Sequence, residues 1–125
     1  MSYKVLVVDD EDAVRDVFVE LLKKEKYVPK QASNGEDALV LIEKEAFDII
    51  LLDIKLPGMS GLDVLKKIRE TKPDLAVIMI TGFAYDDELI AKSKEYGCCG
   101  YIVKNMSPSK IITSFKSIVK KEVKK

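Results

Sequence analysis

Residues 49–65 read IILLDIKLPGMSGLDVL, and this segment decides the fold. Its first four residues form an apolar run without alternation, which is typical of a strand covered on both faces of a parallel sheet. The proline and glycines of LPGMSG indicate a turn. Leu62, Leu65 and Ile68 then recur at helical spacing. The segment predicts a buried strand that ends just before Asp53, followed by a turn and an amphipathic helix.

The alternation of strand and helix continues in both directions along the chain. Central strands are predicted at Val5–Val8 and Leu75–Ile80. Edge strands are predicted at Tyr27–Ala32, which contains a proline, and at the short Gly100–Val103, because sheets tolerate proline mainly at their edges. The helical patterns lie at Val14–Leu22, Ala38–Ile42, Leu62–Ile68, Asp87–Tyr96 and Ile111–Val119. We therefore expect an α/β fold, in which one domain over residues 1–125 forms a doubly wound five-stranded parallel sheet with five helices.

The composition limits the classes of function. Lys plus Arg and Asp plus Glu both number 21, so the overall charge favours neither nucleic acid nor an anionic membrane. No apolar run approaches the roughly 20 residues of a membrane helix, and no signal peptide is evident, so we expect a cytoplasmic protein. Cys98 and Cys99 are adjacent and suggest neither a disulfide scaffold nor a metal site. Because the sequence has no histidine, its chemistry falls to carboxylates.

Polar side chains follow four of the predicted strands. They are Asp9 and Asp10 after the first strand, Asp53 after the third, Thr81 after the fourth and Lys104 after the fifth. Ligand sites of doubly wound sheets lie at the carboxyl ends of the strands, so these five residues are expected on one rim. Two carboxylates about 5 Å apart repel by roughly 3 kcal/mol at an effective dielectric constant near 20. A hard cation such as magnesium would relieve this repulsion.

The sequence resembles the receiver domains of two-component response regulators, the CheY-like superfamily. Four segments carry the resemblance, in order and over nearly the whole length: VLVVDDED (5–12), IILLDIKLPGMSGLDVL (49–65), VIMITG (77–82) and GYIVK (100–104). The resemblance implies the flavodoxin-like strand order 2-1-3-4-5 and a signalling domain that accepts a phosphoryl group without being an enzyme in its own right. DIKLPGM (53–59) also resembles the corresponding segment of sporulation-type phosphorelay proteins.

The resemblance assigns roles to the residues of the rim. Asp53 would accept the phosphoryl group beside Mg²⁺, with Mn²⁺ as a substitute. Asp10 would bind the metal directly, Asp9 largely through water, and the backbone carbonyl of Lys55 would be a further ligand. The donor would be a histidine kinase or a histidine phosphotransferase. The signal would pass to a downstream protein, with no direct role for nucleic acid or a membrane.

The resemblance also implies a switch. Thr81 and Lys104 would hold phosphoryl oxygens, and movement of Thr81 would open space for Tyr101 on the last strand. Lys55 and Phe83 occupy positions that in this family tune the lifetime of the phosphoryl group. The fourth predicted helix has a thin apolar stripe and is expected to be the softest.

One departure from the family pattern concerns the end of the last strand. Most relatives have Lys-Pro with a cis bond there, whereas Asn105 follows Lys104 in this chain. A cis bond before a residue other than proline costs about 3–4 kcal/mol, so a trans bond is expected.

Other functions fit the sequence less well. An aspartate-nucleophile, Mg²⁺-dependent phosphohydrolase would share the D-x-D of residues 10–12, but its further acidic pair follows the lysine, and here Asp86 and Asp87 precede Lys104. A flavin-binding module would need a phosphate cradle after the first strand, where DDED would repel phosphate. A pseudo-receiver is disfavoured because all five chemical positions are present. Whether the chain acts alone as a phosphorelay intermediate or within a longer regulator stays open.

Overall fold

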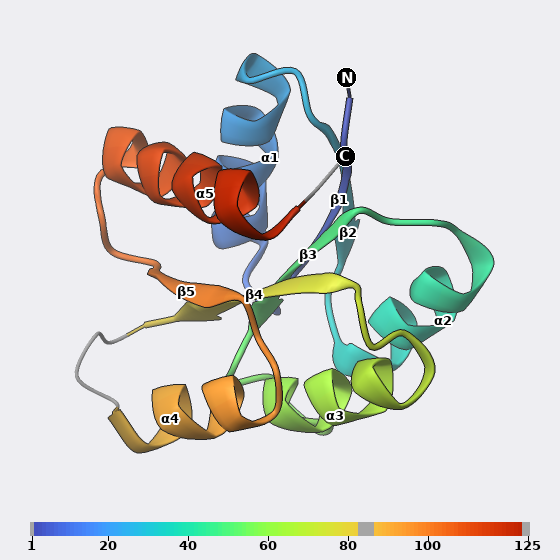
Figure 1. The fold of residues 1–125 in the computed structure, drawn as a ribbon. Coiled ribbons are helices and arrows are strands. Elements are labelled where there is room, and N and C mark those ends of the chain that lie inside the picture. The colour runs from blue at the N-terminus through green and yellow to red at the C-terminus, as the bar shows by residue number, and fades with distance from the viewer. Residues whose placement is uncertain (1, 83–86, 124–125) are drawn as a thin grey trace.

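The computed structural model describes residues 2–82 and 87–123, and it contains the predicted alternation of strands and helices (Figure 1). The strands are β1 (Lys4–Val8), β2 (Val28–Ala32), β3 (Ile49–Asp53), β4 (Ala76–Thr81) and β5 (Gly100–Val103). The helices are α1 (Asp12–Lys24), α2 (Gly35–Lys44), α3 (Gly61–Thr71), α4 (Asp87–Glu95) and α5 (Pro108–Glu122). No helix within the described residues is long and apolar enough to cross a membrane.

The five strands form one parallel sheet in the order β2-β1-β3-β4-β5. This order confirms the fold prediction and the placement of the two weaker strands at the edges. Pro29 lies in β2, an edge strand that pairs with β1 alone. Because no strand lies on the other side of β2, the missing N–H of the proline deprives no second strand of a hydrogen bond.

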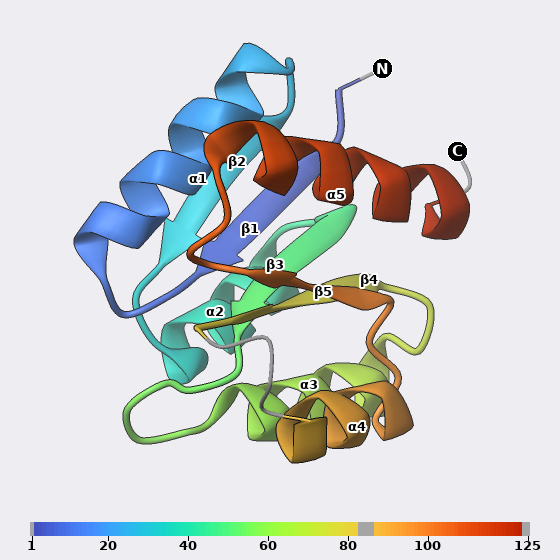
Figure 2. The ribbon, with the colours of Figure 1, turned by 90° about the vertical axis from the view of Figure 1, so that its left-hand side faces the viewer.

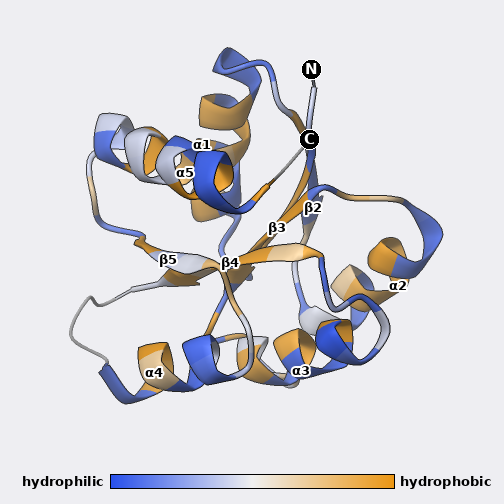
Figure 3. Ribbon diagram, in the orientation of Figure 1, coloured by the Kyte–Doolittle hydropathy of each residue, from blue (hydrophilic) through white to orange (hydrophobic). Residues whose placement is uncertain are grey.

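Helices cover both faces of the sheet, with α1 and α5 on one side and α2, α3 and α4 on the other (Figure 2). The central strands supply alternate residues to the two layers. In β3, Ile49 and Leu51 pack with α1 and α5, whereas Ile50 and Leu52 pack with α2 and α3. Both faces of β3 are therefore apolar, which explains its unbroken hydrophobic run in the sequence (Figure 3).

The amino ends of β1, β2 and β4 and the carboxyl ends of β3 and β4 each differ by one residue from the predicted bounds, and the two carboxyl ends bear on the site. Asp53 and Thr81 are the last residues of β3 and β4, where the sequence placed them just after the strands. The ladder continues by one residue because Asp53 pairs with Ile80 and Thr81 pairs with Val103. The sheet itself therefore fixes the backbone of both residues.

The remaining backbone expectations concern the last strand and the cysteines. No cis peptide bond occurs within the described residues, so the Lys104–Asn105 bond is trans, as predicted. Cys98 and Cys99 are both free thiols, as predicted. Cys98 packs against the apolar layer on one side of the sheet, and Cys99 packs against the layer on the other side. Burial raises the pKa of both thiols.

Candidate functional site

The carboxyl ends of the central strands meet at one open cavity of about 280 Å³. The residues that line it are Asp10, Glu11, Asp53, Ile54, Lys55, Thr81, Gly82 and Lys104. Four of the five predicted rim residues are in this set, and the fifth, Asp9, lies directly behind it as a fully buried side chain. The structure thus brings together the residues that the sequence placed on one rim.

Three carboxylates of this rim form a cluster suited to a cation. One oxygen from each of Asp9, Asp10 and Asp53 lies within 4.8 Å of the others. Asp9 Oδ1 accepts a hydrogen bond from the Glu11 N–H at 2.9 Å. Asp9 Oδ2 is buried and forms an ion pair with Lys104 Nζ at 2.8 Å. Three clustered carboxylates, which are hard oxygen donors, fit the preference of Mg²⁺ for carboxylates completed by water.

Lys104 is the cation at the centre of the site. Its Nζ lies 2.8 Å from Asp9 Oδ2, 2.9 Å from Asp53 Oδ2 and 3.2 Å from Glu11 Oε1. Burial alone would lower the pKa of Lys104, but the hydrogen bonds and charges of Asp9 and Asp53 outweigh it and hold the pKa above its usual range. The lysine is therefore charged at neutral pH and neutralises part of the acid cluster.

Asp53 has the most perturbed carboxyl group of the site. Its side chain is nearly buried, and burial is the main reason that its pKa rises from 3.8 to about 6. The charge of Asp9 raises this pKa further, whereas Lys104 and the Lys55 N–H, which donates to Asp53 Oδ1 at 3.2 Å, lower it. Burial and nearby negative charges disfavour the ionised form of a carboxyl group. A carboxyl group whose pKa is raised in this way inside a cleft is a candidate functional residue.

The turn beneath the site depends on glycine. A Cβ atom on Gly61 would lie 2.0 Å from the carbonyl oxygen of Asp53, so the turn packs directly on the backbone of the strand end. The Gly61 N–H donates to the Ile54 carbonyl at 2.9 Å. Gly58 has a φ of +72°, a conformation that favours glycine. The LPGMSG segment therefore supports the strand end that carries Asp53.

Comparison with known proteins agrees with this geometry. The family model of the response regulator receiver domain matches residues 5–116. This chain is a response-regulator receiver domain. It is 38% identical over 104 residues to Sporulation initiation phosphotransferase F of Bacillus subtilis, covering 83% of each chain. It is 35% identical over 121 residues to the transcriptional regulatory protein SrrA of Staphylococcus aureus, covering 97% of this chain and 49% of SrrA. The chain thus spans about half the length of that regulator.

Solved structures show the same architecture. A CheY-like receiver domain protein from Methanospirillum hungatei superimposes with a TM-score of 0.88 at 32% identity, covering 98% of this chain and 97% of that one. The BeF₃-activated DrrB receiver domain gives a TM-score of 0.82 at 31% identity and covers 96% and 99% of the two chains. Both structures therefore share the overall fold of this chain.

The structure places the other predicted site residues as follows. Thr81 is buried at the end of β4, and its carbonyl accepts the Lys104 N–H at 2.8 Å, which ties the two strand ends together. Tyr101 is 37% exposed, and Lys94 Nζ lies 5.9 Å from the centre of its ring. The side chain of Lys55 is exposed. Phe83, a predicted lifetime-tuning residue, lies outside the described residues.

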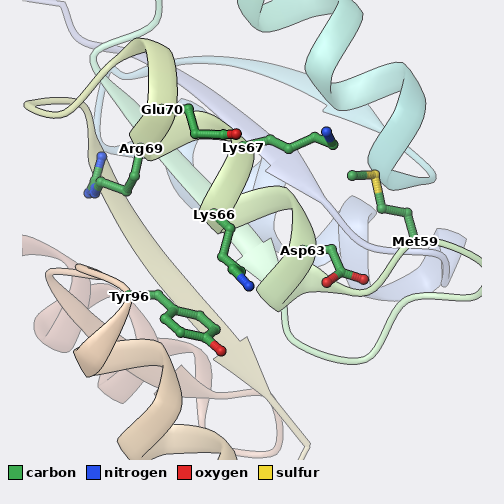
Figure 4. Close-up of a pocket in the computed structure, with 7 residues that line it drawn as sticks. All are labelled: Met59, Asp63, Lys66, Lys67, Arg69, Glu70 and Tyr96. Atoms are coloured by element: carbon green, nitrogen blue, oxygen red, sulfur yellow. The ribbon is translucent and has the colours of Figure 1, made fainter.

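A larger cavity of about 620 Å³ lies away from this rim, between α3 and α4 (Figure 4). Its lining consists of Met59, Asp63, Lys66, Lys67, Arg69, Glu70 and Tyr96. None of the predicted site residues of the receiver domain belongs to this set. The smaller cavity carries the acid cluster and Lys104, so chemistry and not volume identifies the candidate site.

The sequence did not single out two residues that complete the site. Glu11 contacts Lys104, and Arg15 donates to the Asp9 carbonyl at 2.6 Å. Gly61, which packs beneath Asp53, belongs to the turn that the sequence predicted. The contacts of Glu11 and Arg15 depend on how the loop between β1 and α1 folds, which has no sequence periodicity.

Proposed function

We propose that this receiver domain accepts a phosphoryl group on Asp53. The observation that carries the proposal is the position of Asp53 among the three clustered acids. Asp9 is fully buried and does not line the cavity, whereas Asp10 lines the cavity but forms no ion pair with a described residue. Asp53 lines the cavity and has Lys104 Nζ at 2.9 Å. It is therefore the carboxylate that a phosphoryl donor can reach and that has a cation beside it to balance the incoming phosphoryl oxygens.

The proposed reaction is a phosphoryl transfer from histidine to aspartate. A carboxylate oxygen of Asp53 attacks phosphorus, the bond between phosphorus and the donor's imidazole nitrogen breaks, and that nitrogen takes its electron pair. The product is an acyl phosphate. Because this sequence contains no histidine, the phosphohistidine comes from a histidine outside it, on a histidine kinase or a histidine phosphotransferase. The chain's own work is to position Asp53 and balance charge.

Asp9, Asp10, Asp53 and the Lys55 carbonyl would hold Mg²⁺, or Mn²⁺ in its place. The metal would neutralise charge on the transferring oxygens. Lys104 Nζ lies 2.9 Å from Asp53 Oδ2 and would contact a phosphoryl oxygen. Its raised pKa supports this role, because the lysine stays charged throughout the reaction.

The signal would leave the site through β4 and β5. The new charge on Asp53 would draw the Thr81 hydroxyl toward the phosphoryl group, and Tyr101, now 37% exposed, would move into the space so opened. Such a change shifts the population of two surface states, one of which binds a downstream protein better.

Phosphorylation by acetyl phosphate tests the proposal. The chain and its Asp53→Asn and Asp16→Asn variants are incubated with and without Mg²⁺, and intact mass reports the addition of one phosphoryl group. Asp16 is an exposed acid on α1 with no part in the cluster, so its variant is the matched control. We expect a Mg²⁺-dependent product in the parent and the control only. A product in the Asp53→Asn variant, or in the parent without any divalent ion, would overturn the assignment.

The structure also bears on the phosphohydrolase alternative. The second acid of its D-x-D motif, Asp12, forms an ion pair with Arg15 and is 88% exposed. Within the described residues, the acidic cluster able to hold a metal consists of Asp9, Asp10 and Asp53 and does not include Asp12. This arrangement favours the phosphoacceptor function over catalytic turnover.

A further inference from the structure

Arg15 is a charged residue that the proposed phosphoryl transfer does not use, although it lies next to the acid cluster. Its side chain is only 13% exposed. Nη1 donates to the main-chain carbonyl of Asp9 at 2.6 Å, Nε donates to Gln31 Oε1 at 3.1 Å, and Nη2 forms an ion pair with Asp12. One guanidinium therefore joins the loop after β1 to strand β2 and to helix α1.

The hydrogen bond from Arg15 to the Asp9 carbonyl affects the backbone of both Asp9 and Asp10. This carbonyl belongs to the planar peptide unit that links Asp9 to Asp10. Holding its oxygen restrains the orientation of this peptide plane, which affects the directions in which both side chains leave the backbone. Two further bonds hold the same segment. The Asp9 N–H donates to the Ala32 carbonyl at 3.2 Å, and the Glu11 N–H donates to Asp9 Oδ1 at 2.9 Å across Asp10.

We propose that Arg15 is a positioning residue, which holds Asp9 and Asp10 in the geometry that binds a divalent cation. The inference rests on the proposed function of the acid cluster. Groups that orient metal ligands typically change metal affinity 10–100-fold when they are removed. The guanidinium donates in a rigid planar fork, so it can hold a backbone carbonyl and the Gln31 amide oxygen together. A lysine ammonium or a glutamine amide at position 15 cannot reproduce both bonds.

Calorimetric titration with Mg²⁺ at pH 7 tests the role of Arg15 without a phosphoryl donor. The variants are Arg15→Gln and Arg15→Lys. The matched control is Arg69→Gln, because Arg69 also donates to main-chain carbonyls, those of Gly97 at 2.7 Å and Lys72 at 3.1 Å, but does so beside the cavity between α3 and α4 (Figure 4). Both arginines support backbone, and only Arg15 contacts the backbone of the acid cluster.

We expect Arg15→Gln to weaken Mg²⁺ binding about tenfold or more, with Arg15→Lys in between. Arg69→Gln should keep the parent's affinity within about twofold while lowering the melting temperature. With acetyl phosphate, Arg15→Gln should need about tenfold more Mg²⁺ for half-maximal phosphorylation and should approach the parent's rate once Mg²⁺ saturates. A residue that only supports the fold would lower the melting temperature and leave the Mg²⁺ dependence unchanged.

Two results would overturn the inference while the proposed function stood. The first is parental Mg²⁺ affinity in both Arg15 variants. The second is an equal loss of affinity in the Arg69→Gln control, which would show a general effect of lost stability. If the parent itself bound no Mg²⁺, the proposed metal site would fail, and the role of Arg15 would fail with it. If Arg15→Gln did not fold, the Arg15→Lys variant, which keeps the charge and can reach one carbonyl, would decide the matter.

Discussion

Replacing Asp53 by asparagine should stabilise the metal-free domain at neutral pH, although it removes the proposed phosphoacceptor. The folded protein must hold a carboxylate whose pKa is raised to about 6 from 3.8, mainly by burial. At pH 7 a difference of this size amounts to about 3 kcal/mol of unfolding free energy. Solvent in the open cavity screens part of it, so we expect a gain of about 2 kcal/mol from the neutral asparagine. For a domain of this size, that gain raises the melting temperature by roughly 8 °C.

The raised pKa of Asp53 also predicts how the stability of the folded domain changes with pH. Between pH 3.8 and about 6 the folded state holds a proton on Asp53 that the unfolded chain has already released. The contribution of this group is therefore fully present below pH 3.8 and is lost as the pH rises through about 6. The Asp53→Asn variant lacks this loss, so the stability difference between variant and parent should grow across that window.

Thermal unfolding followed by circular dichroism, in EDTA and at pH values from 4 to 8, measures both quantities. The Asp16→Asn variant controls for the loss of a negative charge elsewhere and should stay within about 0.5 kcal/mol of the parent. Added Mg²⁺ should stabilise the parent more than the Asp53→Asn variant, which has lost one proposed ligand. An Asp53→Asn variant no more stable than the parent at pH 7, or a difference independent of pH, would refute the reasoning.

Further predictions concern the turn, the phosphoryl lifetime and the fourth helix. Gly61→Ala should lower the unfolding free energy in urea by about 2 kcal/mol or more, because the added methyl group would meet the Asp53 carbonyl, and a loss below about 0.5 kcal/mol would contradict this. Lys55→Ala and Phe83→Ala should each shorten the lifetime of the acyl phosphate measured by intact mass after donor removal, because the resemblance places both residues at positions that tune this lifetime; unchanged lifetimes would argue against that role. Helix α4 buries only Ile90 and Ser93, so its amides should exchange hydrogen faster than those of β3, and equal protection would show that α4 is not the softer element.

Much of the fold was predictable because its strongest sequence signals are local. The unbroken apolar run of β3 reflects a strand covered on both faces, and Pro29 indicated an edge strand. The strand order was taken from the resemblance to receiver domains. Helices cover both faces of any doubly wound sheet, and the periodicity of a strand does not show which strands are its neighbours. The predicted carboxyl ends of β3 and β4 fell one residue short because the pairing of Asp53 and Thr81 depends on the neighbouring strand.

The candidate site was predictable as a set of positions and less so as a set of contacts. Strand ends in a parallel sheet meet at one edge, so Asp9, Asp53 and Lys104 could be placed together from their order alone. The burial of Asp9 and the bond from Arg15 to its carbonyl could not be read in this way. Both depend on the path of a short loop, where one backbone angle decides which side chain faces the cavity.

The charges of the site explain why the proposed metal and the proposed phosphoryl group depend on each other. The clustered carboxylates of Asp9, Asp10 and Asp53 carry three negative charges. Lys104, which also contacts Glu11, balances at most one of them, so at least two are left without a counterion. A divalent cation would remove this excess negative charge, which would let a negatively charged phosphoryl donor approach.

Phosphorylation would then replace the single charge of Asp53 by the larger charge of an acyl phosphate. The metal and Lys104 would have no further charge to offer, so the added charge would act on hydrogen-bond donors at the strand ends, among which we propose the Thr81 hydroxyl as the responding group. Thr81 lies at the end of β4, and its main chain is bonded to Lys104, so the residue that would respond to the new charge is already coupled to the lysine that neutralised the old one.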